Sequence, residues 1–131
     1  MSERYVTRML VVEDSPGDVF FVQRMLYYSA PDQHFDIVSV PRLADAFRRA
    51  EKEKFDVVLL DLNLLDIDGI ASVAALHAQI PNTPIIVYSG MESKKLKEAA
   101  LMCGASEYLV KGCNGGSLTQ AITHHTSHHA A

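Results

Sequence analysis

The chain has 131 residues, enough for one domain with a hydrophobic core but not for two. Charged residues make up 21% and hydrophobic residues 48% of it, a globular balance that argues against wholesale disorder. The net charge of −4 argues against a nucleic-acid-binding surface, and no apolar run approaches the roughly 20 residues of a membrane span. We therefore expect a soluble, cytoplasmic protein with no nucleic-acid or membrane partner. Its two cysteines, Cys103 and Cys113, lack CxxC spacing and are expected to be free thiols.

Short apolar runs alternate with amphipathic stretches along the chain, which is the pattern of βα units. We expect five strands, at Met9–Val12, Phe35–Val40, Val57–Leu60, Pro84–Tyr88 and Glu107–Val110. A helix is expected after each strand, because apolar residues recur there at helical spacing. The letters SLTQ at residues 117–120 spell a capping box that would open the fifth helix. This alternation predicts one α/β domain with a parallel sheet and helices on both faces.

Polar residues follow four of the five expected strands. Glu13 and Asp14 follow the first, Asp61 the third, Ser89 the fourth and Lys111 the fifth. In a parallel sheet these positions meet at one edge, where ligands of such folds bind. Three carboxylates together repel, so either one is protonated or a cation neutralises them, and Mg²⁺ suits a site of few carboxylates. The lysine and the serine would then supply a positive charge and a hydroxyl for an anion beside the metal.

Four segments carry a resemblance to a known family: LVVEDSPGD, DVVLLDLNLLDIDG, IIVYSG and GASEYLVKG. In this order and spacing they resemble the receiver domain of two-component response regulators, over residues 7 to about 123. The resemblance implies a doubly wound, five-stranded parallel sheet of the flavodoxin-like order 2-1-3-4-5 with five helices. It also implies a single receiver domain over residues 1–131, in which residues 124–131 form a histidine-rich end of the last helix or a tail.

The resemblance implies that Asp61 is the phosphoacceptor. The phosphoryl group would come from a histidine of a sensor kinase or of a histidine phosphotransfer protein. Glu13 and Asp14 would hold Mg²⁺ together with Asp61, and Asn63 would add its backbone carbonyl. Such a protein catalyses only its own phosphorylation and dephosphorylation and turns over no metabolite.

The resemblance also implies how the phosphoryl group is read. Lys111 would pair with the phosphoryl oxygens, Ser89 would donate its hydroxyl to them, and Tyr108 would swing inward as the serine moves. The face formed by the fourth helix, fifth strand and fifth helix would then change shape. Its partner would be a downstream protein or a second receiver.

Three residues depart from the commonest family pattern. Leu65 stands where proline is usual after the phosphoacceptor, which would loosen that loop. Gly112 follows Lys111 where a cis-bonded proline is typical, so glycine backbone geometry would set the lysine instead. Gly90 follows Ser89 where alanine is frequent, which would leave more room above the phosphoryl site.

Two alternatives to a phosphorylated receiver stay open. One is a pseudo-receiver, an interaction module that keeps the fold without phosphorylation, although retention of all five strand-end residues argues against it. The other is a metal-dependent phosphatase of similar architecture. A phosphatase of the haloacid dehalogenase type would want Asp-x-Asp after the first strand, whereas here Asn63 follows Asp61 after a later one.

Two further features suggest binding surfaces. Phe21 and Tyr28 lie well round from the apolar stripe of the first helix, so we expect them either to dock a kinase or phosphotransfer helix or to cover sheet edges. At the chain end, His124 pairs with His128 and His125 with His129 at i, i+4. That spacing can bind a transition metal, and the alternative is a frayed tail that binds nothing specifically.

Overall fold

The computed structural model describes residues 6–63 and 69–126 and contains five strands and five helices in these ranges. The strands are β1 (Val6–Val12), β2 (His34–Val40), β3 (Val57–Leu60), β4 (Ile85–Ser89) and β5 (Glu107–Val110). The helices are α1 (Pro16–Ser29), α2 (Leu43–Lys52), α3 (Gly69–Gln79), α4 (Lys94–Met102) and α5 (Gly115–His125). Within the described ranges, no helix is long and apolar enough to span a membrane.

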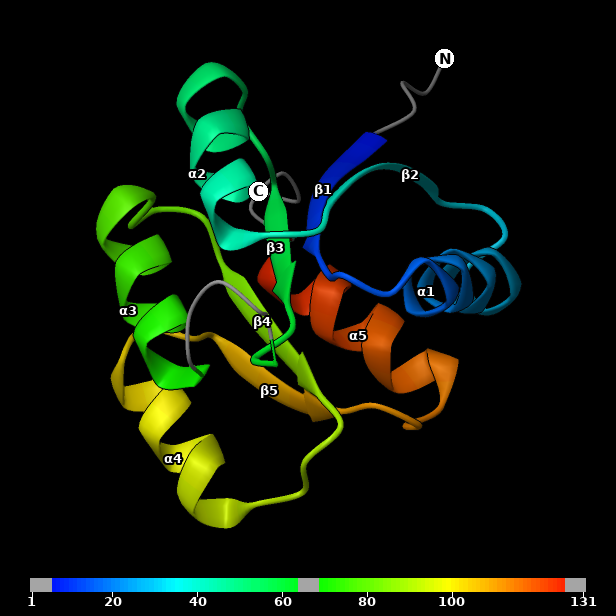
Figure 1. The fold of residues 1–131 in the computed structure, drawn as a ribbon. Helices are drawn as coiled ribbons and strands as arrows, with labels where there is room; N and C mark the ends of the chain where they lie inside the picture. Colours follow the sequence, from blue (N-terminus) through cyan, green and yellow to red (C-terminus); the bar gives the residue numbers. More distant parts are fainter. Residues whose placement is uncertain (1–5, 64–68, 127–131) are drawn as a thin grey trace.

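The strands form one parallel sheet in the order β2-β1-β3-β4-β5, which confirms the predicted doubly wound topology. The chain moves to one side of β1 to form β2 and to the other side to form β3, so the strand order reverses beside β1 (Figure 1). In sheets of this kind, the crevice at such a reversal is the usual ligand site.

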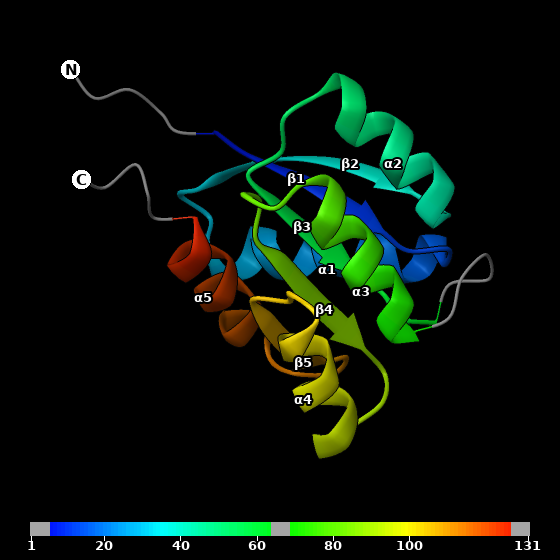
Figure 2. The same cartoon turned by 90° about the vertical axis from the view of Figure 1, so that its left-hand side faces the viewer.

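Two layers of helices cover the sheet. Helices α2, α3 and α4 lie on one face, and α1 and α5 lie on the other (Figure 2). Because successive strand residues point to opposite faces, β1 contributes to both cores. The core under α2, α3 and α4 includes Leu10, Val12, Val58, Leu60, Ile85 and Val87. The core under α1 and α5 includes Met9, Val11, Val57, Leu59, Ile86 and Tyr88. All four residues of β3 are buried, as predicted for a strand covered on both faces.

The first strand begins three residues earlier than predicted, at Val6 rather than Met9. Arg8 interrupts the apolar run, but ion pairs of its guanidinium group with Asp36 at 3.1 Å and Glu53 at 2.8 Å satisfy its charge within the sheet. The guanidinium also lies 5.0 Å from the centre of the Phe55 ring. A charged residue can therefore continue this strand, because its partners come from distant parts of the chain.

The predicted capping box of the last helix is wrong. Helix α5 begins at Gly115, and its N-cap is Asn114, whose Oδ1 accepts a hydrogen bond from the backbone N–H of Ser117 at 2.8 Å. Asn114 therefore satisfies a free N–H group of the first turn, and Ser117 is not the cap. Ser117 lies inside the first turn of the helix.

Candidate functional site

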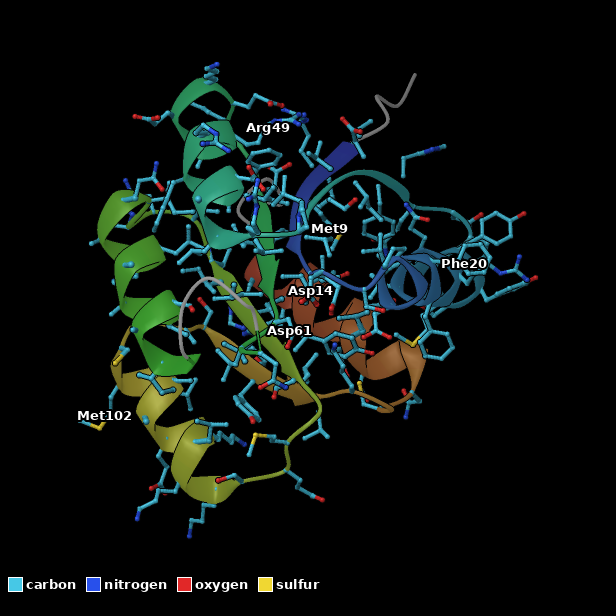
Figure 3. The ribbon with its side chains drawn as sticks, in the orientation of Figure 1. Met9, Asp14, Phe20, Arg49, Asp61 and Met102 are labelled. Atoms are coloured by element: carbon cyan, nitrogen blue, oxygen red, sulfur yellow. The ribbon has the colours of Figure 1, made fainter. Side chains whose placement is uncertain are left out.

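Three carboxylates meet at the carboxyl edge of the sheet. Glu13 and Asp14 follow β1, Asp61 follows β3, and one oxygen of each lies within 4.8 Å of the others. Asp14 and Asp61 lie beside each other past the ends of these strands (Figure 3). Glu13 and Asp61 are buried, with 7% and 5% of their surface exposed, whereas Asp14 is exposed. The structure thus brings together the three residues that the strand-end pattern singled out.

Strand pairing brings these residues together. Val12 and Leu60 are paired at the ends of β1 and β3, so the residues that follow them emerge side by side. The ladder continues one residue further, because the backbone N–H of Asp61 donates to the carbonyl of Val12 at 3.1 Å. On the other side of β1, the N–H of Glu13 donates to the carbonyl of Val40 at 2.9 Å. Apolar strands buried on both faces therefore hold the polar residues at fixed positions.

Lys111 neutralises part of this negative charge. Its Nζ lies 2.7 Å from Oε1 of Glu13, 2.7 Å from Oδ2 of Asp18 and 3.3 Å from Oδ2 of Asp61. Burial alone would lower the pKa of Lys111, but its hydrogen bonds to Asp18 and Glu13 outweigh burial and raise that pKa. The ammonium group therefore stays charged throughout the physiological pH range. Its backbone is fixed as well, since the N–H of Lys111 donates to the carbonyl of Ser89 at 2.7 Å.

Glu13 has a strongly perturbed carboxyl group. Burial, together with the neighbouring charge of Asp61, raises its pKa to about 7, against the opposing effect of the hydrogen bond from Lys111. The backbone N–H of Ser15 donates to Oε2 of Glu13 at 3.2 Å and orients the group. Near neutral pH, Glu13 is therefore partly protonated unless a cation replaces its proton.

Asp61 is contacted through both of its oxygens. Lys111 lies near Oδ2, and the backbone N–H of Asn63 donates to Oδ1 at 3.1 Å. Asn63 is exposed, and the contact it makes with Asp61 uses its N–H group. Leu65, the expected departure in this loop, lies outside the described residues.

Ser89 and Tyr108 are linked through one residue. Ser89 is completely buried at the end of β4, and its Oγ accepts a hydrogen bond from the N–H of Met91 at 3.2 Å. The hydroxyl of Tyr108 donates to the carbonyl of Met91 at 2.6 Å. With only 7% of its surface exposed, Tyr108 already lies inside, whereas the resemblance implied that it turns inward later. Two contacts hold Tyr108 in this position: the Met91 carbonyl accepts the hydrogen bond of its hydroxyl, and its ring packs in the core under α4.

The two glycines near the site differ in what they require. Gly112 has a φ of +96°, which side chains rarely adopt, and it follows Lys111 directly. No cis peptide bond occurs among the residues that the structure describes, so glycine geometry takes the place of a cis proline here. At Gly90, an added Cβ would meet no atom within 4 Å, which agrees with the expected extra room after Ser89.

The donor set fits a hard divalent cation. Glu13, Asp14 and Asp61 each offer a carboxylate oxygen in a cluster small enough for one ion, and oxygen is the ligand that Mg²⁺ and Ca²⁺ prefer. The exposed Asp14 leaves an open side through which water or an anion can complete the coordination. The sulfur of Cys113, the nearest thiol along the chain to Lys111, is not part of this cluster.

Two residues that contact the site, Asp18 and Ser15, were not predicted from the sequence. Asp18 lies in the first turn of α1, yet its carboxylate contacts Lys111 as closely as Glu13 does. Its position four residues after Asp14 could have indicated a place near the site, because the first turn of α1 follows the end of β1 directly. An acidic residue there is also favourable for the helix itself, so this signal was masked by an ordinary role at the helix N-terminus.

Aromatic side chains of α1 form a second surface together with the start of α5. Phe21 and Tyr28 are 54% and 66% exposed, so more than half of each ring is open to solvent, and the choice between docking a partner and covering a sheet edge stays a prediction. We call the surface the α1–α5 groove; it encloses about 690 Å³ and is lined by Phe20, Phe21, Arg24, Met25, Tyr28, Ser29, Gly115 and Gly116. Phe20 points away from the sheet at the outer side of α1 (Figure 3). The guanidinium of Arg24 packs 5.0 Å from the centre of the Tyr28 ring.

The histidine pairs at the chain end fall partly outside the described residues, which exclude His128 and His129. His124 and His125 form the last turn of α5. Nε2 of His125 lies 2.9 Å from Oε1 of Glu107 in β5, so this histidine has a protein partner. The expected i, i+4 metal pairs therefore remain predictions.

Comparisons with known proteins point to one family. A family model described as the response regulator receiver domain matches residues 9–123. The transcriptional regulatory protein PrrA of Mycobacterium tuberculosis is 34% identical over 104 residues, which are 79% of this chain and 43% of PrrA. The chemotaxis protein CheY of Listeria monocytogenes is 24% identical over 88% of this chain and 94% of its own length.

A solved structure adds a chemical parallel. A response regulator protein from Burkholderia pseudomallei, described with a phosphorylated aspartic acid, calcium ion and citrate, is 26% identical with a TM-score of 0.76. The match covers 95% of this chain and 71% of that structure. This chain spans less than half the length of PrrA, so PrrA contains sequence with no counterpart here.

Proposed function

This chain belongs to the response regulator receiver domain family, and we propose from that premise that it accepts a phosphoryl group on Asp61 in a Mg²⁺-dependent reaction. One observation carries the proposal. The Asp61 carboxylate is buried at the sheet edge in a cluster with two further carboxylates, and the Lys111 ammonium group lies 3.3 Å from it. Burying that charge is costly unless partners compensate it, and the compensation here suits a phosphoryl group beside a cation.

Phosphoryl transfer needs in-line positioning and charge neutralisation more than covalent work by the protein. We propose that Glu13, Asp14 and Asp61 hold Mg²⁺ together with the backbone carbonyl of Asn63. When bound, the ion would offset the negative charge of the phosphoryl oxygens. An oxygen of Asp61 forms the new bond to phosphorus, and the phosphorus–nitrogen bond of the donor histidine breaks, with its electron pair remaining on the imidazole. Lys111 pairs with a phosphoryl oxygen, which its charged state favours.

The phosphorylated state is read through Ser89. A phosphoryl group brings about −1.5 to −2 charges and strong acceptor oxygens, toward which the Ser89 hydroxyl would turn. Met91 bonds both the Ser89 hydroxyl and the Tyr108 hydroxyl, so a shift of Ser89 disturbs the contact that holds Tyr108. We infer that this link carries the change to the face formed by α4, β5 and α5, as a shift in population between conformations.

Receiver domains interact with histidine kinases and with downstream targets, and we propose specific surfaces for both. The α1–α5 groove presents exposed rings on the helix that begins two residues after Asp14, which suits a helix of a kinase or of a histidine phosphotransfer protein. A downstream protein or a second receiver would bind the α4–β5–α5 face. PrrA is named a transcriptional regulatory protein, but the net charge of −4 favours a protein partner over nucleic acid for this chain.

We propose that residues 1–131 act as one receiver domain that modifies only itself. Two alternatives make different predictions. A pseudo-receiver would bind its partner without phosphorylation, and a metal-dependent phosphatase would hydrolyse small phosphate esters with many turnovers. The relative from Burkholderia pseudomallei, which has a phosphorylated aspartic acid, supports by analogy the hypothesis that this chain is a phosphorylated receiver domain.

The test is the intact mass of the protein after incubation with acetyl phosphate. With Mg²⁺, we expect a single phosphoryl adduct, which disappears when Mg²⁺ is left out and in the Asp61→Asn variant. The same samples are assayed for release of phosphate over time, since many turnovers would favour the phosphatase. No adduct, together with no change in the NMR spectrum on adding beryllofluoride and Mg²⁺, would favour the pseudo-receiver.

A further inference from the structure

Asp18 is the ion partner of Lys111 that does not belong to the carboxylate cluster. We propose that Asp18 is a positioning residue that holds Lys111 in the unphosphorylated protein and competes with the phosphoryl group for it, so that Asp18 slows phosphorylation. This inference rests on the function proposed above and adds a regulatory residue to the same site.

The donors of Lys111 are fully used in the structure. An ammonium group has three N–H bonds, and here they face Glu13 at 2.7 Å, Asp18 at 2.7 Å and Asp61 at 3.3 Å. A phosphoryl oxygen can therefore pair with Lys111 only if one of these contacts is given up. The proposed ligand set of Mg²⁺ contains Glu13 and Asp61, so cation binding changes their surroundings but leaves the bond of Asp18 to Lys111 in place.

Helix α1 holds Asp18 in position. Ser15 caps the helix by accepting a hydrogen bond from the N–H of Asp18 at 3.3 Å, and Pro16 begins the first turn. The side chain of Asp18 is 46% exposed, whereas that of Glu13 is 6% exposed. Opening the contact with Asp18 therefore costs less than opening the one with Glu13, because water can replace the lysine at Asp18. Of the two short contacts of Lys111, this is the one that yields.

The backbone beside Lys111 leaves its side chain dependent on these contacts. Gly112 follows it with a φ of +96°, and no proline ring stiffens this segment. The position of Nζ therefore depends mainly on its ion pairs. Without Asp18, Nζ would keep Glu13 and Asp61 as partners and have one N–H free for a phosphoryl oxygen.

Charge acts in the same direction. Four carboxylates, those of Glu13, Asp14, Asp18 and Asp61, lie at this edge of the sheet with one lysine, so an anionic donor approaches a negative site. Replacing Asp18 by asparagine removes one negative charge and keeps the shape of the side chain. Both effects predict faster phosphorylation.

The experiment measures initial rates of adduct formation with acetyl phosphate at saturating Mg²⁺, by intact mass. Asp18→Asn should react about two- to fivefold faster than the wild type, the range that a half-exposed ion pair can supply. Asp32→Asn is the matched control, because it removes the same charge from an exposed position beyond the end of α1 and should react like the wild type. In a Lys111→Met background, followed over hours, adding Asp18→Asn should change the rate less than about twofold, because Asp18 acts through the lysine.

A second readout needs no phosphoryl donor. The ¹H–¹⁵N NMR signal of the Lys111 ammonium group, assigned by its loss in Lys111→Met, should be visible in the wild type and in Asp32→Asn. It should shift or broaden in Asp18→Asn. An unchanged lysine signal in Asp18→Asn would overturn the inference, whatever the protein does with acetyl phosphate.

The two proposals fail in different ways. If the wild type forms the adduct and Asp18→Asn reacts at the same rate or more slowly, the inference is overturned and the proposed function stands. An equal gain in the Lys111→Met background would likewise overturn the inference, because Asp18 would then act by charge alone. If neither the wild type nor any variant forms an adduct, the proposed function fails, and so does the inference that Asp18 slows phosphorylation.

Discussion

Oε1 of Glu13 and Nζ of Lys111 lie 2.7 Å apart, in an ion pair between residues that are 98 positions apart in the chain. The pair joins the end of β1 to the end of β5, across the edge of the sheet where the carboxylates meet. Both side chains are largely buried, with 6% and 22% of their surface exposed. Ion pairing and the cost of burying carboxylates therefore meet at this edge of the sheet, so the stability of the protein should respond to pH and to cations.

Stability should fall as the pH rises, through the titration of Glu13. Burial raises the pKa of Glu13 in the folded protein to about 7 from an ordinary value of 4.5, so the folded state binds this proton more tightly than the unfolded state. The stabilisation is complete below pH 4.5 and is lost as the pH rises through 7. It amounts to roughly 3 kcal/mol at about 1.36 kcal/mol per pKa unit.

Urea unfolding between pH 4.5 and 8 without divalent ions measures this effect. Because other carboxylates titrate in the same range, the informative quantity is the difference between the wild type and Glu13→Gln. We expect the Glu13→Gln variant to gain stability relative to the wild type as the pH rises. A difference that is constant across this range would contradict the perturbed pKa.

Mg²⁺ should raise the thermal stability of the wild type more than that of Asp14→Asn. A ligand that binds only the folded state stabilises it by mass action, about 2.7 kcal/mol at a hundredfold excess over Kd. Asp14 is exposed and supplies one of the three carboxylate oxygens, so its replacement should weaken Mg²⁺ binding by at least about tenfold without disturbing the core. Without Mg²⁺ the variant should be slightly more stable than the wild type, because repulsion falls. Equal Mg²⁺-dependent Tm shifts in both proteins would exclude Asp14 as a ligand.

Gly112→Ala should destabilise the protein, and Gly90→Ala should not. A side chain at the φ of +96° found at Gly112 costs about 1–2 kcal/mol, although no atom lies near enough to clash. Gly90 also has open space around it, and its backbone lies outside the strained range. Urea unfolding compares the two variants, and the phosphorylation rate should fall only in Gly112→Ala, since Lys111 precedes this residue. Equal stabilities would mean that the backbone relaxes without cost.

Phe21→Glu should slow phosphotransfer from a protein donor. Phe21 lines the α1–α5 groove and is 54% exposed, so the change should leave the fold intact while removing apolar docking surface. The matched control is Tyr27→Glu, a change at another exposed ring of α1, 67% exposed, that does not line this groove. Rates are measured with a phosphorylated histidine phosphotransfer protein that reacts with the wild type, and again with acetyl phosphate.

We expect the protein donor, but not acetyl phosphate, to react more slowly with Phe21→Glu, and Tyr27→Glu to behave like the wild type with both donors. Unchanged transfer from the protein donor in a folded Phe21→Glu variant would exclude the groove as the docking site. Slower transfer in both variants would indicate a general effect of charge on α1.

Much of the site could be predicted because parallel strands place their carboxyl ends together. Glu13, Asp61 and Lys111 each follow an apolar run, so their convergence follows from topology alone. Asp18 could not be found in this way, because it lies on a helix and an acidic first turn has an ordinary explanation there. Its role depends on a distance to Lys111, which sequence spacing does not determine.

Two other details, the N-cap of α5 and the position of the Tyr108 ring, each had two possible outcomes that the sequence does not distinguish. Both Asn114 and Ser117 can cap a helix, and the structure places the asparagine first. Tyr108 could lie outside or inside, and the hydrogen bond to the carbonyl of Met91 decides for the inside. The exposed rings of α1 could not be predicted either. Apolar residues are buried only when a neighbouring element covers them, and the sequence does not show which residues are covered.

The most direct test of the central claim locates the phosphoryl group. The protein is phosphorylated with acetyl phosphate and Mg²⁺, the acyl phosphate is reduced with borohydride, and peptide masses are mapped. The account predicts that reduction converts a single aspartate to homoserine, at position 61, and that none is converted without Mg²⁺. Conversion at Asp14 or Asp18 instead, or a phosphoryl group that survives on His124 or His125, would contradict it.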